Sequence, residues 1–140
     1  MANTAVKEEI GASADRLWAL VVDFGKIDWI PGAEGARTEG KGPGMVRILG
    51  APGAEIRERL ESVDEARRQI AYTIPVGNPL PVTDYRATMT VHARGADRSE
   101  LEWACTFEPK ADVSEADVTA QVHGLYGMLI GWIRDKLGAG

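Results

Sequence analysis

The chain has 140 residues, 44% of them hydrophobic and 26% charged, which is typical of a single globular domain over residues 1–140. Its net charge is −5 and no Lys/Arg cluster stands out, which argues against nucleic-acid binding. The lone Cys105 cannot form an internal disulfide, and the sequence shows neither an apolar N-terminal leader nor an apolar run of ~18–20 residues. We therefore expect a cytoplasmic protein without a membrane span.

The first third of the chain predicts one strand and two short helices. Residues 4–10 alternate weakly between polar and apolar, which indicates a strand. A serine cap and apolar residues at helical spacing then predict a helix over 13–25, and a second short helix is expected over 26–30, before Pro31. Trp29, at the junction of this helix and a loop, has two open interpretations, cavity wall or plain core filling.

The middle of the chain predicts six strands joined by short turns. They are expected at 33–38, 45–49, 54–63, 68–74, 82–92 and 99–108. The segment 75–81 between two of them holds three prolines and a glycine, yet it also carries the apolar Val76 and Leu80. Apolar side chains in such a segment are typical of a loop that folds over the mouth of a cavity.

A long helix is predicted over 114–138. Ser114 is a good N-cap, Gly138 is a natural C-cap, and the helix would be about 35 Å long. Its apolar stripe comprises Val118, Val122, Leu125, Leu129, Ile133 and Leu137. So long a stripe needs a broad partner, so we expect an α+β fold in which a curved antiparallel sheet of about seven strands wraps around this helix. Such a half-barrel leaves space that is typical of small-molecule sites.

Glu58 is the sharpest candidate for chemistry. Strand alternation puts it on the inner face between Ile56 and Leu60, where apolar surroundings favour a protonated carboxyl and hence general acid/base use. Tyr85 or Tyr72 could serve as its hydrogen-bond donor. The simpler hypothesis is that Glu58 holds ordered water or a polar group of a ligand, or pairs with an inner arginine.

No cofactor or metal is expected. Two histidines and one cysteine do not form a recognisable zinc pattern. Alternation places His92 on the outer face, and His123 lies at the edge of the helix stripe, where it could be solvated or enter a cavity. Cys105 faces inward and is expected to be inert core.

The order of these elements, with particular residues, resembles the START-like or helix-grip (SRPBCC) superfamily, of the polyketide cyclase/dehydrase and lipid-transport type. The stretches that carry the resemblance are an opening helix at 13–21 (SADRLWALV), its continuation at 23–32 ending in WIPG, a hairpin at 58–60 and 64–68 (ERL and DEARR), and a strand at 84–92 (DYRATMTVH). The order also resembles that of the plant abscisic-acid receptors. This second likeness implies that loops 49–53 and 75–81 guard the cavity mouth and that Glu58, Tyr85 and Tyr126 face the cavity. The receptors hold a carboxylate with a lysine, and no lysine lies on strands 33–38 or 54–63, so hormone binding of that kind is not supported.

The resemblance implies binding of a small hydrophobic or amphipathic ligand, of lipid, polyketide or aromatic type, between the sheet and the last helix. The predicted ligand-binding residues are Trp29, Ile56, Glu58, Tyr72, Leu80, Tyr85, Ala87, Trp103, Val122 and Tyr126. The alternative is a polyketide cyclase/dehydratase-like enzyme that uses Glu58 as acid/base with Tyr85. The expected partner is a small hydrophobic molecule, and the loops at the mouth could equally form the surface of a homodimer.

Overall fold

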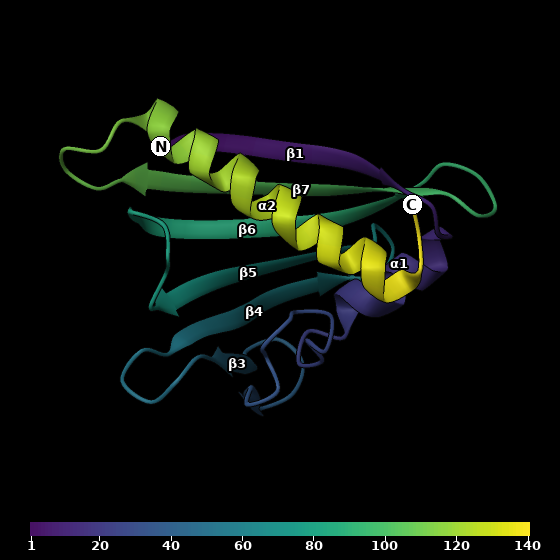
Figure 1. Cartoon of the computed structure of the whole chain (residues 1–140), viewed down its shortest axis with the longest axis horizontal. Helices are drawn as coiled ribbons and strands as arrows, with labels where there is room; N and C mark the ends of the chain where they lie inside the picture. The colour runs from purple at the N-terminus through teal and green to yellow at the C-terminus, as the bar shows by residue number, and fades with distance from the viewer.

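The computed structural model describes all residues from Met1 to Gly140 as seven strands and two helices (Figure 1). In chain order the elements are β1 (Ala2–Ile10), α1 (Ala14–Val22), β2 (Arg37–Glu39), β3 (Val46–Leu49), β4 (Ile56–Asp64), β5 (Gln69–Val76), β6 (Val82–Ala93), β7 (Ser99–Pro109) and α2 (Glu115–Leu137). The strands form one sheet in the order β1-β7-β6-β5-β4-β3-β2, and every neighbouring pair is antiparallel. The predicted α+β fold is confirmed.

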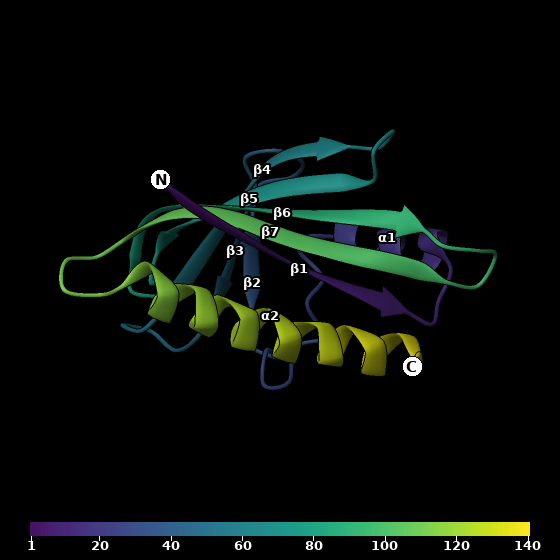
Figure 2. The ribbon, with the colours of Figure 1, turned by 90° about the horizontal axis from the view of Figure 1, so that it is seen from above.

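Helix α2 lies on one side of the twisted sheet and crosses it diagonally (Figures 1 and 2). Both predicted caps are present: the Ser114 side chain accepts from the N–H of Asp117 at 3.0 Å, and Gly138 is left-handed with φ 65°. The helix residues buried against the sheet are Val118, Val122, Tyr126, Ile130 and Ile133. This row keeps a four-residue spacing through Tyr126 and Ile130, so the predicted stripe was wrong at Leu125 and Leu129, which are half-buried beside it.

One short helix follows β1, and the prediction of two was wrong. Helix α1 begins after Ser13, whose hydroxyl accepts from the N–H of Arg16 at 3.2 Å, and it ends at Val22. Residues 23–26 and 27–30 form only isolated four-residue turns, closed by hydrogen bonds from Lys26 N to Asp23 O and from Ile30 N to Ile27 O, both 3.0 Å. The first turn of a helix is costly to form and is stabilised only by the hydrogen bonds of the turns that follow. The stretch between Gly25 and Pro31 is too short to add them.

Strand β2 is also shorter than predicted. It covers only Arg37–Glu39, because residues 33–36 close a turn through a hydrogen bond from Ala36 N to Ala33 O. The other strand boundaries differ from the predicted ones by at most two residues.

A hydrogen bond from the Arg16 guanidinium to Leu137 O at 2.7 Å joins α1 to the C-terminal end of α2. Neither helix combines the length and the apolar character that a bilayer crossing requires.

Candidate functional site

A cavity of about 180 Å³ lies between the sheet and α2. Of the 16 residues that line it, 13 are hydrophobic. They are Trp29, Ile30, Arg47, Leu49, Ile56, Glu58, Tyr72, Ile74, Pro79, Tyr85, Trp103, Leu125, Tyr126, Met128, Leu129 and Trp132. Pro79 and Met128 are exposed, so the cavity reaches the surface where the β5–β6 loop meets the middle of α2.

Aromatic side chains make up much of the wall. All three tyrosines of the chain and three of its four tryptophans line the cavity. Trp103 stacks on Tyr126 with ring centroids 4.8 Å apart and an interplanar angle of 18°. The indole N–H of Trp103 also donates to the Tyr72 hydroxyl at 3.0 Å. These contacts fix flat apolar surfaces around the space, and such surfaces favour a planar ligand.

A β-bulge aims Tyr85 into the cavity. Between the pairs Thr83–Glu108 and Arg86–Thr106, strand β6 has one residue more than β7. Asp84 accommodates the bulge by adopting φ 54°, a left-handed conformation that aspartate tolerates better than most residues. As a result Val82 and Tyr85, which simple alternation would place on opposite faces, are both buried.

The three tyrosine hydroxyls stay protonated at neutral pH. Burial raises the pKa of Tyr72, and the negative charge of Glu58 acts in the same direction. Burial likewise raises the pKa of Tyr85 and of Tyr126, whose hydroxyls are hydrogen-bonded to each other. The cavity therefore contains neutral O–H groups, which can donate to an acceptor atom on a ligand.

The polar end of the cavity is an ion pair between Arg47 and Glu58. The two residues face each other in the β3–β4 register, and Arg47 Nε donates to Glu58 Oε1 at 2.6 Å. The guanidinium also donates to Phe24 O at 3.0 Å and lies 3.9 Å from the centroid of the Phe24 ring. The Glu58 side chain is 14% exposed, so its charge is neutralised chiefly by Arg47.

The predicted ligand-binding residues divide into two groups. Those that line the cavity are Trp29, Ile56, Glu58, Tyr72, Tyr85, Trp103 and Tyr126. Leu80, Ala87 and Val122 are buried in the core without lining it, so the structure does not bring them to the site. Ala87 and Val122 have no exposed surface and belong to the hydrophobic core.

Nine further residues line the cavity that were not predicted from the sequence. They are Ile30, Arg47, Leu49, Ile74, Pro79, Leu125, Met128, Leu129 and Trp132. Leu49 and Pro79 belong to the two loops that were expected to guard the mouth, and Arg47 could have been found as the inner arginine hypothesised for Glu58. Met128 and Trp132 lie outside the predicted helix stripe, and no sequence pattern indicated that they line a cavity.

The candidate catalytic residues Glu58 and Tyr85 both line the cavity, yet no hydrogen bond joins them. Glu58 is engaged by Arg47, and the Tyr85 hydroxyl is engaged by Tyr126. Their use in catalysis stays a prediction.

The remaining candidates for chemistry lie away from the cavity wall. The His92 ring is hydrogen-bonded to Glu102 at 2.9 Å and that of His123 to Thr4 at 2.7 Å. Burial raises the pKa of the Cys105 thiol, which disfavours the reactive thiolate. No three His, Cys, Asp or Glu side chains gather in the arrangement that a metal ion needs.

A curved antiparallel sheet that holds a long C-terminal helix, with an apolar cavity between them, defines the helix-grip class. The chain belongs to the polyketide cyclase/dehydrase and lipid transport family, whose sequence profile matches residues 1–134. Membership of this family implies a cavity for a hydrophobic ligand, in agreement with the lining found here.

Solved structures similar to this chain include two bacterial proteins and a plant enzyme. An uncharacterized protein from Bacillus thuringiensis is 33% identical, with a TM-score of 0.81 over 96% of this chain and 98% of that chain. The protein XoxI from Bacillus cereus is 32% identical, with a TM-score of 0.81 over 97% and 95% of the two chains. Norcoclaurine synthase from Thalictrum flavum, 22% identical with a TM-score of 0.74 over 97% and 86%, shares the fold. No curated protein sequence matches this chain.

Proposed function

We propose that the protein binds a small hydrophobic or amphipathic molecule, of lipid, polyketide or aromatic type, in the cavity between the sheet and α2. The observation that carries the proposal is the lining, in which 13 of 16 residues are hydrophobic. An apolar space with a few polar groups at one end is the usual form of a small-molecule site. The family to which the chain belongs supports the same function.

The size of the cavity limits the ligand. Its volume of about 180 Å³ is smaller than the roughly 300–1,000 Å³ of most drug-sized sites. At ~30 Å³ per water molecule, a ligand would displace about six waters. The cavity therefore suits a planar group of about one or two rings, placed between the aromatic walls, with an acceptor atom directed at the tyrosine hydroxyls or at Arg47.

Binding of naphthalene, a two-ring probe without polar groups, tests the proposal by isothermal titration calorimetry. Leu129→Trp places a larger side chain into the cavity wall, and Leu137→Trp is the matched control, because Leu137 is also half-buried on α2 but does not line the cavity. We expect naphthalene to bind to the wild type and to Leu137→Trp, and at least about tenfold more weakly to Leu129→Trp. Equal binding by all three proteins, or by none, would contradict the proposal.

The alternative function is a polyketide cyclase/dehydratase-like enzyme with Glu58 as acid/base and Tyr85 as donor. In its favour, Glu58 lines a mostly apolar cavity. Against it, a substrate would have to compete with Arg47 for the carboxylate and with Tyr126 for the Tyr85 hydroxyl. Incubation with aromatic polyketide substrates distinguishes an enzyme from a binding protein. Turnover by the wild type that is lost in Glu58→Gln would favour the enzyme, whereas unchanged release of the compound would favour a binding protein.

A homodimer through the loops at the cavity mouth stays a prediction. The large hydrophobic side chains that are exposed are Met1, Val76 and Met128; Met128 lines the cavity, and Val76 belongs to the segment 75–81. Analytical ultracentrifugation of the wild type and of a Val76→Ser/Met128→Ser double variant measures whether these residues hold two copies together.

A further inference from the structure

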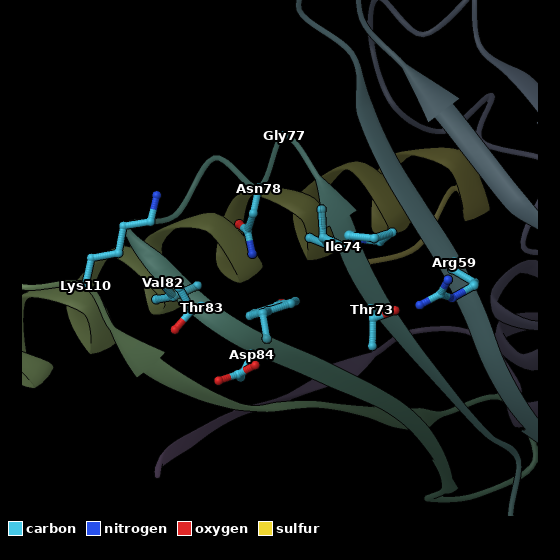
Figure 3. Close-up of a pocket in the computed structure, with 11 residues that line it drawn as sticks. Arg59, Thr73, Ile74, Gly77, Asn78, Val82, Thr83, Asp84 and Lys110 are labelled. Carbon is cyan, nitrogen blue, oxygen red and sulfur yellow. The ribbon is translucent and has the colours of Figure 1, made fainter.

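The sheet has a gap between β5 and β6, and a groove of about 570 Å³ opens at this gap (Figure 3). The two strands are paired from Gln69–Thr90 only as far as Thr73–Arg86. Beyond that point β5 continues to Val76 and β6 begins at Val82, but the two segments are not paired with each other.

Bulges in both strands cause this separation. Strand β5 has an extra residue between Thr73 and Val76, relative to its partner β4, and β6 has its extra residue at Asp84. A bulge bends its strand and increases the local twist, so two bulges that face each other turn the strands apart. Pro75 has no N–H to donate to a ladder across the gap.

The groove and the cavity share two lining residues. Ile74 and Tyr85 line both spaces, while the other lining residues of the groove do not reach the cavity. Figure 3 shows the groove with α2 behind the two strands, so a molecule that passed between Ile74 and Tyr85 would run from the cavity through the sheet to the surface. This route would be distinct from the mouth at Pro79 and Met128.

Hydrogen-bond donors predominate in the groove. The Asn78 carbonyl oxygen accepts from Leu80 N at 2.9 Å, which leaves the amide NH₂ directed into the groove (Figure 3). Arg59 uses its Nε on Glu61 at 2.9 Å, and its terminal NH groups lie at the groove. Lys110, at the other end, has no ion-pair partner. The single carboxylate there is Asp84.

We propose that this groove binds the carboxylate end of an elongated amphipathic ligand whose apolar end occupies the cavity, the two parts joined through the β5–β6 gap. The inference rests on the proposed function, because the apolar end must bind first. Lys110 supplies a positive charge and the Asn78 amide supplies hydrogen-bond donors to the carboxylate, whereas the negative charge of Asp84 repels the carboxylate. Tyr85 gives up its contact with Tyr126 and rotates to admit the chain of the ligand.

Three probes test the inference: naphthalene, 6-(2-naphthyl)hexanoic acid and the corresponding primary alcohol. Their dissociation constants are compared for the wild type, Lys110→Gln, Asp84→Asn and the control Lys41→Gln, whose lysine is exposed in the turn before β3 and far from the groove lining. Lys110 and Asp84 are exposed, so their variants are expected to fold. A partly exposed charge pair contributes up to ~1 kcal/mol, which corresponds to about fivefold in affinity.

We expect the acid to bind the wild type about three- to fivefold more tightly than the alcohol. Lys110→Gln should remove this preference, Asp84→Asn should increase it, and Lys41→Gln should leave it unchanged, while naphthalene binds all four proteins equally. If naphthalene does not bind, the proposed function itself fails. If naphthalene binds but acid and alcohol bind equally, or the preference survives in Lys110→Gln, the cavity function stands and the groove inference is overturned.

Discussion

The buried ion pair at the polar end of the cavity gives the sharpest prediction of stability. In Arg47→Met, Glu58 loses the donor that lies 2.6 Å from its Oε1, and Phe24 O loses a donor at 3.0 Å. Arg47 is 6% exposed and its guanidinium lies against the Phe24 ring, so methionine keeps much of the apolar contact while the charge is lost. The carboxylate then remains among apolar residues without a partner.

The expected cost follows from this burial. Removal of one partner of a buried ion pair typically destabilises a protein by ~3–5 kcal/mol, because the remaining charge is left unpaired. Replacement of both partners by apolar residues is often neutral or stabilising. We therefore expect Arg47→Met to lower the free energy of unfolding by ~3–5 kcal/mol, and Arg47→Met/Glu58→Met to recover to within about 1 kcal/mol of the wild type.

Urea unfolding followed by tryptophan fluorescence measures these free energies, provided that the m-values agree between variants. The exposed pair Arg59–Glu61, with Nε and Oε2 2.9 Å apart, is the matched control, and Arg59→Met should cost less than about 1 kcal/mol. A loss below about 1 kcal/mol for Arg47→Met, or a double variant as unstable as the single one, would refute the argument that burial makes this pair costly to break.

Three further predictions concern the tyrosines and α2. Burial raises the folded-state pKa of Tyr72, Tyr85 and Tyr126 above the ordinary value of 10.0, so their contribution to stability is complete below pH 10 and is lost as the pH rises toward the folded-state values. Because the chain has no other tyrosine, phenolate absorbance in an alkaline titration should increase only as the circular dichroism signal of the fold disappears; ionisation in the folded protein near pH 10 would argue against burial. Gly124→Ala should stabilise the protein by ~0.8–1 kcal/mol and raise Tm by about 3 °C, since an added Cβ meets no atom within 4 Å; a lower Tm in scanning calorimetry would show an unrecognised contact. Ser114→Ala should cost ~1 kcal/mol in urea unfolding through loss of the cap on Asp117 N, and an unchanged midpoint would contradict the capping role.

The sequence predicted the architecture because each element carries strong local signals. Two-residue alternation defined the long strands, and the Ser114 and Gly138 caps marked the ends of α2 to within one residue. The second short helix was wrong because the five residues before Pro31 are too few for consecutive helical hydrogen bonds. Residues 26–30 form only turns.

The site could be predicted less fully, because its shape depends on how elements far apart in sequence pack together. Glu58 and Tyr72 were placed by alternation alone, whereas Arg47 reaches the site through its register with Glu58. Ala87 is fully buried in the core and does not line the cavity, which alternation alone could not show. The β6 bulge at Asp84, which separates the strands beside Tyr85, has no signature that alternation detects.

Native mass spectrometry of the protein, purified from its own host without denaturation, tests the central claim most directly. The wild type is compared with Leu129→Trp, which fills the cavity wall, and with Leu137→Trp, which does not. We expect a hydrophobic or amphipathic compound on the wild type and on Leu137→Trp that is absent from Leu129→Trp. The same compound on all three proteins, or none on any of them, would contradict the claim that this cavity is a ligand site.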